Sequence, residues 1–410
     1  MGADVKLIDQ KDWRSWVLPK LLYMRPIHRW LVFPHSFADN LVKTLIDEWK
    51  LGKGDLVVDP FGGAGTTVLS AKEKGVPAKG FDLSPLAVLS SRVKVRNYDV
   101  DKLRVLWNRL HRQLCMPKRP LSEPCYPELV VRALKGQRLD TFHYLKQRIN
   151  ALQASRAERE FFMLALVSVL PRFSGAVATG GWLSWTRRHM KAGSIHATFA
   201  RQCEMMLNDL EHASLPRSHR WTAIRADARA LPLAGRSCDA VITSPPYPNR
   251  HDYTRVFGIE LMFAFLSWEQ TRRLRYQSFH SHPEARPKRP RANGFAEPGW
   301  ITRAINRIEK AGERDRIPRM LHGYFLDTYL FLREVRRILR PGGRVAVVVG
   351  NAQYQGIPLE VDTAVAEIGE QVGLVPGEIR VVRERGNSAQ QMKSHGRRPS
   401  RESVVILRKK

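Results

Sequence analysis

The sequence predicts an α/β fold in which helices alternate with the strands of a mostly parallel sheet. Three observations indicate this fold. Short runs rich in β-branched residues are separated by stretches of helical periodicity, the first such run leads through closely spaced glycines into a helix, and the last two runs lie close together with no helical pattern between them. A chain of 410 residues, 43% of them hydrophobic, is long enough for two or three structural units and a sizeable core.

The N-terminal part of the sequence predicts a lead followed by one strand–helix–strand unit. After a tryptophan-rich lead, apolar residues recur every four positions through residues 36–49, which predicts a helix. Residues 56–59 are predicted as a strand that ends at Asp59, followed by a glycine-rich turn and a helix that reaches Lys74. Residues 78–81 form the second predicted strand of this unit.

The middle of the sequence predicts a helical insertion, after which strands return. Residues 83–221 have helical periodicity and no strand pattern, with interruptions at prolines and glycines. The next predicted strands are residues 223–227, 240–243 and 344–349, the last preceded by a helix and by a turn at residues 340–343. Helices between strands predict parallel pairing with right-handed crossovers. Residues 378–382 and 403–407 lack a helix between them, so they predict a closing antiparallel hairpin.

The charge of the chain favours a polyanionic partner. The sequence has 68 Lys and Arg against 39 Asp and Glu, a formal net charge of +29. Nucleic acid is the polyanion that such a surface meets most often inside a cell, and an anionic membrane surface is the alternative. Residues 271–320 hold 13 Lys and Arg against 5 Asp and Glu and are rich in proline, so we predict a mobile basic loop there.

The sequence disfavours membrane, secreted and metal-binding proteins. No apolar run approaches the roughly 18 residues of a membrane span, and the N-terminus lacks the apolar core of a secretory signal. The four cysteines have no C-x-x-C spacing, so we expect free thiols in a reducing cytoplasm. His35, His251, His280 and His282 are scattered along the sequence, and no metal ion is expected.

The most specific local pattern is Val-Val-Asp-Pro-Phe-Gly-Gly-Ala-Gly-Thr-Thr at residues 57–67. A strand that runs through glycines into a helix lets backbone N–H groups approach a ligand. No lysine follows Gly65 as in a phosphate-binding P-loop, so a nucleoside without a polyphosphate fits better. Asp82 ends the next strand, where a carboxylate can accept both hydroxyls of a ribose. The alternative is a glycine-rich turn without a ligand, which Asp59, Phe61 and Asp82 disfavour.

The second pattern is Ser-Pro-Pro-Tyr at residues 244–247, directly after the predicted strand at residues 240–243. Two consecutive prolines fix the backbone and remove two N–H donors, so carbonyl acceptors face outward at the carboxyl edge of the sheet. Ser244 adds a hydroxyl acceptor and Tyr247 adds a flat stacking surface. This arrangement suits a planar ring that bears an amino group. The alternative is a plain Pro-Pro turn with a packing tyrosine.

Together the two patterns resemble the S-adenosylmethionine-dependent DNA amino-methyltransferases, which modify N4 of cytosine or N6 of adenine. The resemblance rests on Asp-Pro-Phe-x-Gly-x-Gly-Thr-Thr at residues 59–67, followed downstream by Ser-Pro-Pro-Tyr at residues 244–247. It extends to Val-Phe-Pro-His at residues 32–35, Ala-Asp-Ala at residues 226–228 and Pro-Gly-Gly at residues 341–343. It implies a Rossmann-like class I methyltransferase sheet with S-adenosyl-L-methionine as the cofactor.

The resemblance also implies which residues hold the cofactor. The glycine-rich turn would hold its methionine part, Asp82 would bind the ribose and Asp227 would accept from the adenine amino group, while residues 33 and 34 would close over it. The cofactor-binding residues implied in this way are Phe33, Pro34, Asp59, Pro60, Phe61, Gly63, Gly65, Thr66, Asp82 and Asp227.

The resemblance implies that the catalytic residues are Ser244, Pro245, Pro246 and Tyr247. The Ser244 hydroxyl and the Pro245 carbonyl would accept hydrogen bonds from the target amino group, while Tyr247 stacks on a base extruded from the duplex. The lone pair of an exocyclic amine is delocalised into its ring. Two acceptors therefore favour a tetrahedral nitrogen whose lone pair is aligned with the methyl group.

Duplex DNA is the expected partner, contacted through the segment after Tyr247 and through two basic segments. The run from Asn249 to Tyr253 either positions the base or a phosphate, or forms a polar rim. The predicted nucleic-acid-binding residues are Asn249, Arg250, Arg286, Lys288, Arg289, Arg291, Arg397 and Arg398.

We divide the sequence into three parts. Residues 1–98 contain the lead and the cofactor-binding half, residues 99–221 are the helical insertion and a candidate for target recognition, and residues 222–410 contain the catalytic half with the basic loop at residues 271–320. The insertion lies between Asp82 and Asp227. In this family the two corresponding positions normally lie on adjacent strands, so the insertion falls in an unusual place.

Cytosine N4 is favoured over adenine N6 as the target, since the serine form of the motif is typical of the cytosine enzymes in the family. An RNA methyltransferase acting on guanine N2 of tRNA and a non-catalytic DNA-binding subunit are the alternatives. A restriction endonuclease or subunits of a defence system are candidate partners, and the cytoplasm is the expected location.

Overall fold

The computed structural model describes residues 5–114, 123–186, 194–218, 220–290, 292–313, 315–386, 396 and 399–410. The strands are β1 (Lys6–Asp9), β2 (Val57–Asp59), β3 (Ala78–Asp82), β4 (Ala176–Thr179), β5 (Trp182–Trp185), β6 (Trp221–Arg225), β7 (Cys238–Thr243), β8 (Leu339–Gly350), β9 (Ala352–Tyr354), β10 (Ile357–Leu359), β11 (Leu374–Arg385) and β12 (Ser400–Lys409).

Eight of the described strands form one large sheet with the order β1-β11-β12-β8-β7-β2-β3-β6, and β4–β5 and β9–β10 form two separate two-stranded sheets. Within the large sheet, adjacent strands run parallel through the series β8, β7, β2, β3 and β6. In contrast, β12 is antiparallel to both β8 and β11. The predicted parallel sheet and closing hairpin are therefore confirmed. β3 pairs directly with β6, so the insertion leaves Asp82 and the segment of Asp227 on adjacent strands, as the family resemblance implies.

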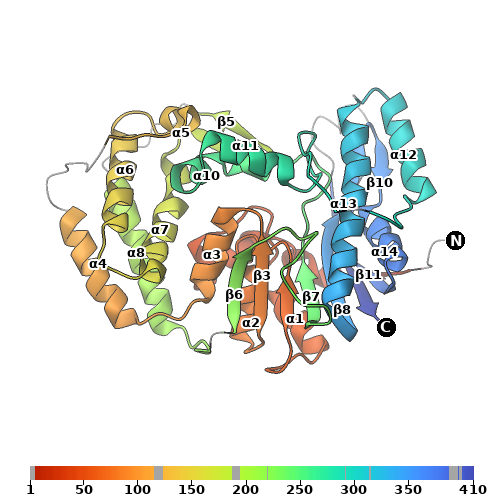
Figure 1. Ribbon diagram of the computed structural model, residues 1–410, viewed down its shortest axis with the longest axis horizontal. Helices are drawn as coiled ribbons and strands as arrows, with labels where there is room; N and C mark the ends of the chain where they lie inside the picture. Colours follow the sequence, from red (N-terminus) through yellow and green to blue (C-terminus); the bar gives the residue numbers. More distant parts are fainter. Residues whose placement is uncertain are drawn as a thin grey trace.

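Helices cover both faces of this sheet (Figure 1). Alternate residues of β8 belong to different hydrophobic cores: Ala346 and Val348 to one, and Val345, Val347 and Val349 to the other. Successive side chains of a strand point to opposite faces, so these two cores make a three-layer α/β/α sandwich. The helices of the sheet half are α1 (Asp39–Glu48), α2 (Thr66–Glu73), α3 (Pro85–Val95), α9 (Tyr253–Val256), α10 (Gly258–Ala264), α11 (Trp268–Gln277), α12 (Gly299–Lys310), α13 (Arg316–Ile338) and α14 (Val361–Gln371).

The insertion is mainly helical, but it contains a hairpin that the sequence pattern did not predict. Its helices are α4 (Val100–Leu114), α5 (Glu128–Ala133), α6 (Gln137–Asn150), α7 (Arg156–Val169) and α8 (Ser194–His212), grouped to one side of the sheet in Figure 1. β4 and β5 pair antiparallel across a turn at Gly180, whose φ is 59°. The prediction of an insertion without strands was wrong, because glycines taken as helix breakers are the turn of this hairpin.

The prediction of a mobile basic loop at residues 271–320 was also wrong. This segment contains most of α11, all of α12 and the start of α13. Ile301, Ile305 and Ile308 lie on one face of α12 and are fully buried. Arginine and proline dominate the composition and hide this helical spacing, and burial of three isoleucines then fixes the helix.

Two smaller differences concern the ends of the sheet. The predicted turn at residues 340–343 lies inside β8 as an irregularity, where the pairing passes from Cys238–Leu339 to Ala240–Arg344. β1 was not predicted, and it pairs in parallel with β11.

Among the described residues, no helix is both long enough and apolar enough to cross a membrane. Cys125, Cys203 and Cys238 are free thiols.

Candidate active site

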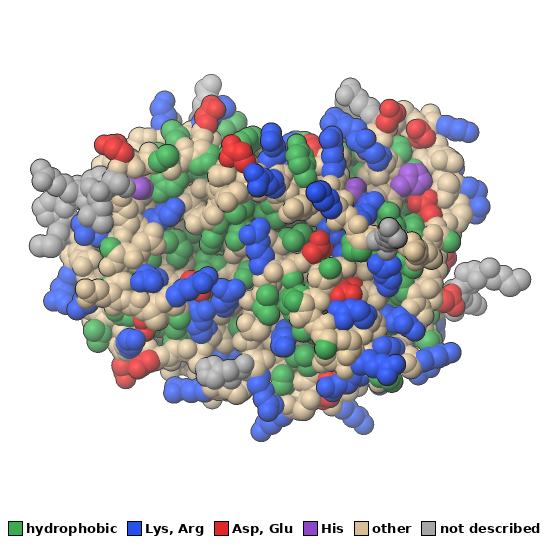
Figure 2. Space-filling view, in the orientation of Figure 1, with side chains coloured by type: hydrophobic (Ala, Val, Ile, Leu, Met, Phe, Trp, Pro, Cys, Tyr) green, Lys and Arg blue, Asp and Glu red, His purple; other side chains and the backbone are tan. Residues whose placement is uncertain are grey.

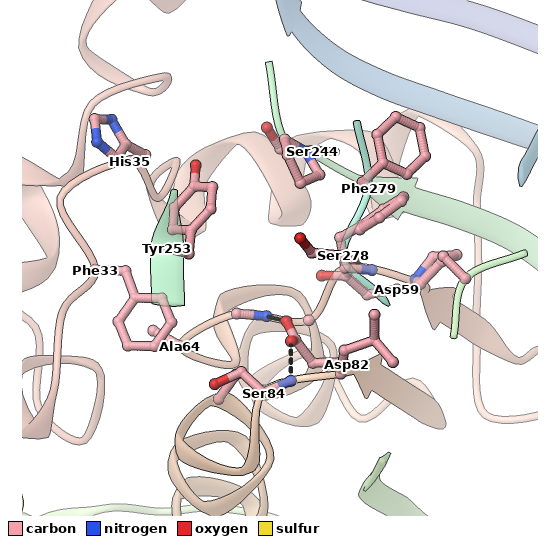
Figure 3. Close-up of a pocket in the computed structure, with 18 of the residues that line it drawn as sticks. Phe33, His35, Asp59, Ala64, Asp82, Ser84, Ser244, Tyr253, Ser278 and Phe279 are labelled. Carbon is pink, nitrogen blue, oxygen red and sulfur yellow. Dashed lines mark hydrogen bonds between the residues drawn. The ribbon is translucent and has the colours of Figure 1, made fainter. Parts of the chain in front are cut away.

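A pocket opens at the carboxyl ends of β2, β3, β6 and β7, where both sequence patterns meet. It holds about 1140 Å³ of space not filled by atoms, a volume that includes the open solvent at its mouth. Figure 3 shows Asp82 and Ser84 below the pocket, Phe33 and Tyr253 on one side and Phe279 on the other. The predicted site residues that line it are Phe33, Asp59, Pro60, Phe61, Gly63, Thr66, Asp82, Asp227, Ser244 and Pro246.

The glycine-rich turn between β2 and α2 is held against β3 and α3. The Gly62 N–H donates to the Phe81 carbonyl at 2.7 Å. Gly65 has a φ of 91°, and a Cβ there would lie 2.6 Å from the Cα of Ser91. Glycine is therefore required at this position for close packing with α3. Gly65 shapes the turn but does not line the pocket.

Asp82 fixes the same turn from below. Its carboxylate accepts the Gly63 N–H at 3.0 Å and the Ser84 N–H at 2.8 Å. Burial raises the pKa of Asp82, and these backbone N–H donors oppose that shift. Each carboxylate oxygen has a further lone pair, so Asp82 can still accept hydroxyl donors from a bound ribose.

Asp59 connects β2 with β7 rather than reaching far into the pocket. It is 2% exposed, and its Oδ1 accepts the Thr243 hydroxyl at 2.6 Å and the Phe61 N–H at 3.1 Å. Burial raises its pKa to about 6, against the opposing effect of these donors. Asp59 thus holds together the strand ends that carry the two sequence patterns.

Asp227 lines the pocket and is paired with Arg229, a residue that the sequence patterns did not single out. The Arg229 guanidinium donates to the Asp227 carboxylate at 2.7 and 2.9 Å, and to buried Asp327 on α13 at 3.0 Å. Arg229 therefore holds the Asp227 carboxylate while the remaining lone pairs of that group stay available to an amino donor.

Ser244 lies at the upper end of the pocket in Figure 3. Its hydroxyl donates to the Val348 carbonyl on neighbouring β8 at 3.1 Å. The hydrogen is thereby committed to the sheet, so the oxygen is left to act as an acceptor. Of the same motif, Pro246 also lines the pocket, whereas Pro245 and Tyr247 do not.

Tyr247 lies beside the pocket in a network of charged side chains. Its hydroxyl donates to Glu402 at 3.1 Å. Glu402 in turn forms an ion pair with Arg383. The Arg385 guanidinium lies over the Tyr247 ring, 5.5 Å from its centroid. The ring is therefore held at one edge and covered by a cation on one face.

The predicted nucleic-acid-binding residues are in different environments. Asn249, Arg286 and Lys288 are exposed, whereas Arg250 forms an ion pair with Glu313 at 2.5 Å. Arg289 differs from the others, because its guanidinium donates to the buried Asp327 carboxylate at 2.9 Å and to the Gly323 carbonyl at 3.0 Å. It is part of the packing between α13 and the segment before α12. Arg291, Arg397 and Arg398 lie outside the described residues.

Several pocket residues were not identified by the sequence patterns. Phe279 and Phe257 line the pocket from segments that follow the Ser-Pro-Pro-Tyr motif, next to Tyr253, which ends the run singled out in the sequence. Phe257 packs against Phe33 with a centroid distance of 4.4 Å. His35 is also in the wall, and its Nε2 lies 2.8 Å from Nε2 of His251. An isolated aromatic residue in a polar segment, such as Phe279, is the only sequence signal that could have indicated them.

Lys94 on α3 connects two walls of the pocket from behind. It is 2% exposed, and its Nζ donates to the Leu31 carbonyl at 2.6 Å and to the Ala64 carbonyl at 2.9 Å. Burial lowers its pKa to about 7. Because Leu31 precedes Phe33 and Ala64 is in the glycine-rich turn, Lys94 keeps these two segments together.

Two groups of histidine and acidic side chains lie close enough to suggest metal sites. They are His28, Asp39 and Glu73, and Asp252, His282 and Glu284. In the first group the Lys43 ammonium is 2.7 Å from both Asp39 and Glu73. In the second, Arg255 and Arg275 pair with Asp252. Protein cations therefore already balance the carboxylates of both groups.

Comparison with known proteins identifies the family. No protein-family model matches the chain. The chain is 27% identical over 437 residues to the type II methyltransferase M.BsoBI of Geobacillus stearothermophilus, covering 93% of this chain and 86% of that protein. It is 26% identical over 431 residues to the type II methyltransferase M.AvaI of Anabaena variabilis, covering 94% and 87%. The chain is therefore a homologue of type II DNA methyltransferases over more than 90% of its length.

Site-specific DNA methylation with S-adenosyl-L-methionine is therefore the function of this type II methyltransferase. The relatives favour this activity over the RNA and non-catalytic alternatives. Solved structures are less similar: TrmN from Thermus thermophilus has 13% identity and a TM-score of 0.30, covering 93% of this chain and 50% of that chain. The [4+2]-cyclase SpnF has 10% identity and a TM-score of 0.34, covering 92% and 83%. The class I methyltransferase fold is therefore assigned from the strand order of this chain's own sheet.

Proposed function

We propose that this type II methyltransferase methylates N4 of a cytosine extruded from duplex DNA. The observation that carries the proposal is the Ser244 hydroxyl, which donates to the Val348 carbonyl at 3.1 Å and so offers its lone pairs to a donor in the pocket. An exocyclic amino group is such a donor. The serine form of the motif, typical of cytosine enzymes in the family that the sequence resembles, supports cytosine over adenine.

The pocket residues fit the cofactor. The turn at Gly62 and Gly63 brings backbone close to the ligand space, Asp82 retains acceptor capacity beneath it, and Phe33 supplies an apolar wall. When bound, S-adenosyl-L-methionine supplies the methyl group. We infer that Asp82 binds its ribose and that Asp227, held by Arg229, accepts from its adenine amino group.

The residues of the chain then act on the target base. Ser244 and the carbonyl of Pro245 accept hydrogen bonds from the amino group, which favours a tetrahedral nitrogen with its lone pair directed at the methyl group. Extrusion costs a few kcal/mol, and the Tyr247 ring offsets part of this by stacking on the base once Arg385 has moved from its face.

The test is nucleoside analysis of DNA from cells that express the chain. Mass spectrometry should find N4-methylcytosine, and single-molecule sequencing should place it in one sequence context. A Ser244→Ala variant should lose about 100-fold or more in methyl transfer while its cofactor affinity stays within twofold. N6-methyladenine instead of N4-methylcytosine would refute the proposed base without refuting DNA methylation.

We also propose that the chain works in the cytoplasm with a restriction endonuclease or defence subunits of matching sequence specificity. The type II relatives support this association. Co-expression of the methyltransferase should protect DNA against an endonuclease that cuts the sequence it modifies. DNA that is fully methylated but is still cut by that endonuclease would argue against such a pair.

A further inference from the structure

The hairpin formed by β4 and β5 carries large apolar side chains into solvent. Trp182 is 51% exposed, Trp185 is 43% exposed and Val177 is 38% exposed. In Figure 1 this hairpin lies at the top of the view, between α5 and α11. Hydrophobic burial normally removes tryptophan from water, so two half-exposed tryptophans on a four-residue strand indicate a surface that meets a partner.

The tip of the hairpin lies against the segment that follows the Ser-Pro-Pro-Tyr motif. A Cβ at Gly181 would be 3.0 Å from the Arg250 carbonyl and 3.1 Å from the Cα of His251. Glycine at this position therefore allows close contact between the hairpin and the catalytic segment. Two residues beyond His251 begins α9, whose Tyr253 and Thr254 line the pocket. The hairpin and the base-binding side of the pocket are direct neighbours.

Cations surround the hairpin. The Arg255 guanidinium of α9 lies 4.3 Å from the Trp182 ring centroid, and that of Arg132 on α5 lies 3.9 Å from the Trp185 centroid. Lys135 and Arg172 are exposed near the base of the hairpin, where the Gly175 N–H donates to the Ala133 carbonyl at 2.7 Å. In the described part of the chain, neither they nor Arg132 form an ion pair. This surface is therefore complementary to a polyanion that also presents flat rings.

We propose that the β4–β5 hairpin enters a groove of the substrate DNA beside the extruded base and that Trp182 stacks on a neighbouring nucleobase. Arg132, Lys135 and Arg172 then face the phosphates. This proposal rests on DNA as the substrate and identifies which part of the helical insertion contacts it. A protein partner of the same surface is the alternative that the experiment below separates.

The first experiment compares Trp182→Ala, Trp182→Phe and the control Tyr23→Ala, an exposed aromatic residue (55%) of the short helix Pro19–Met24. The probe is sheared genomic DNA, which contains every short recognition sequence. Trp182→Ala should raise the DNA dissociation constant and the KM for DNA about 10-fold or more, as expected when one base–aromatic stack is removed. Trp182→Phe should recover most of this loss. All three variants should bind S-adenosyl-L-methionine with unchanged affinity.

Unchanged DNA affinity and KM in Trp182→Ala would overturn the proposal and leave the surface for a protein partner. A second measurement uses the unmodified enzyme, so that misfolding of a variant cannot decide the outcome. Irradiation with bromouracil-substituted duplex should crosslink the peptide that contains Trp182. Crosslinks that map only to other peptides would also overturn it. Neither readout depends on which base receives the methyl group. An error in the cytosine assignment can therefore be distinguished from an error in the proposed DNA contact of the hairpin.

Discussion

Asp82 combines structural and ligand-binding roles in one side chain. It accepts two backbone N–H groups of the turns around it and retains acceptor capacity toward the pocket. Asp82→Ala should weaken cofactor binding by about 1–3 kcal/mol, because ribose hydroxyls would lose their partner in a buried site. Calorimetry measures this directly. Asp239→Ala is the control, since Asp239 also accepts a backbone N–H, from Leu56 at 2.8 Å, but outside the pocket. Equal affinities in both variants would remove Asp82 from the ribose site.

Tyr247 should act through its ring and not through its hydroxyl. Tyr247→Ala should lower methyl transfer to duplex DNA by roughly 5-fold to 100-fold, the loss expected for one base–aromatic stack, while cofactor affinity is nearly unchanged. Tyr247→Phe removes the hydrogen bond to Glu402 and keeps the ring, so it should retain most activity. Filter-bound counts of transferred radioactive methyl groups compare the variants. A Tyr247→Ala enzyme that works at the unmodified rate would exclude the stacking role.

At the level of single residues, local motifs predicted the pocket better than they predicted its surroundings. Asp59 and Asp82 are the last residues of β2 and β3, and Ser244 directly follows β7, so the carboxyl edge of a parallel sheet brings them together. Phe279 and Arg229 were not singled out, because the place of Phe279 in the pocket wall and the pairing of Arg229 with Asp327 depend on contacts between segments distant in sequence. Arg289 was assigned to DNA from its charge alone, and its pairing with Asp327 depends on a contact distant in sequence.

Among the helices, α3 carries a buried charge that should make stability depend on pH. Burial lowers the pKa of Lys94 from 10.5 to about 7, so between these values the unfolded chain binds a proton that the folded chain does not. Stability should therefore rise with pH across this range, by up to about 1.4 kcal/mol per pH unit from this group. Below pH 7 the folded protein carries the full cost of the buried charge.

Lys94→Met removes this dependence. Its destabilisation relative to the unmodified protein should be larger at pH 9 than at pH 7, because only the unmodified protein gains stability in between. Urea unfolding at the two pH values measures the difference, and Lys53→Met, at an exposed lysine, is the control. A difference that does not change with pH would show that Lys94 is not buried as a titrating group.

For secondary structure, prediction succeeded where periodicity and composition agreed. β2, β3 and the β11–β12 hairpin follow clear apolar runs. α12 was missed because its three buried isoleucines lie among arginines, so composition indicated a loop while spacing indicated a helix. The β4–β5 hairpin was missed because its strands are short and expose most of their side chains, which leaves no alternation of buried and exposed residues to detect.

At the scale of the whole molecule, positive charge on the face drawn in Figure 2 is spread widely rather than confined to one patch. Figure 2 shows Lys and Arg distributed over the visible face, with hydrophobic side chains gathered nearer its middle. Replacing exposed Arg286 and Lys288 by Ser should flatten the slope of log affinity against log salt by about 0.9 for each phosphate that the variant no longer neutralises. Filter binding to duplex DNA at several salt concentrations gives this slope.

The matched control for that experiment replaces Lys50 and Lys53, exposed cations that precede β2 at the amino end of the sheet. These lie at the edge opposite the pocket, so their replacement should leave the slope unchanged. If the two double variants have the same slope, Arg286 and Lys288 contribute to solubility and not to phosphate binding.

The pairing of β1 with β11 has a consequence for how the chain folds during synthesis. Lys6 of β1 pairs with Glu378 of β11. During synthesis β1 is made long before β11, so it lacks this partner until residues 378–381 have left the ribosome. Until then it is an unpaired edge able to bind other extended chains. Its charged ends, Lys6 and Asp9, limit such association during that interval. Pairing of β1 with β11 thus requires two segments separated by most of this sequence to meet after both have been synthesised.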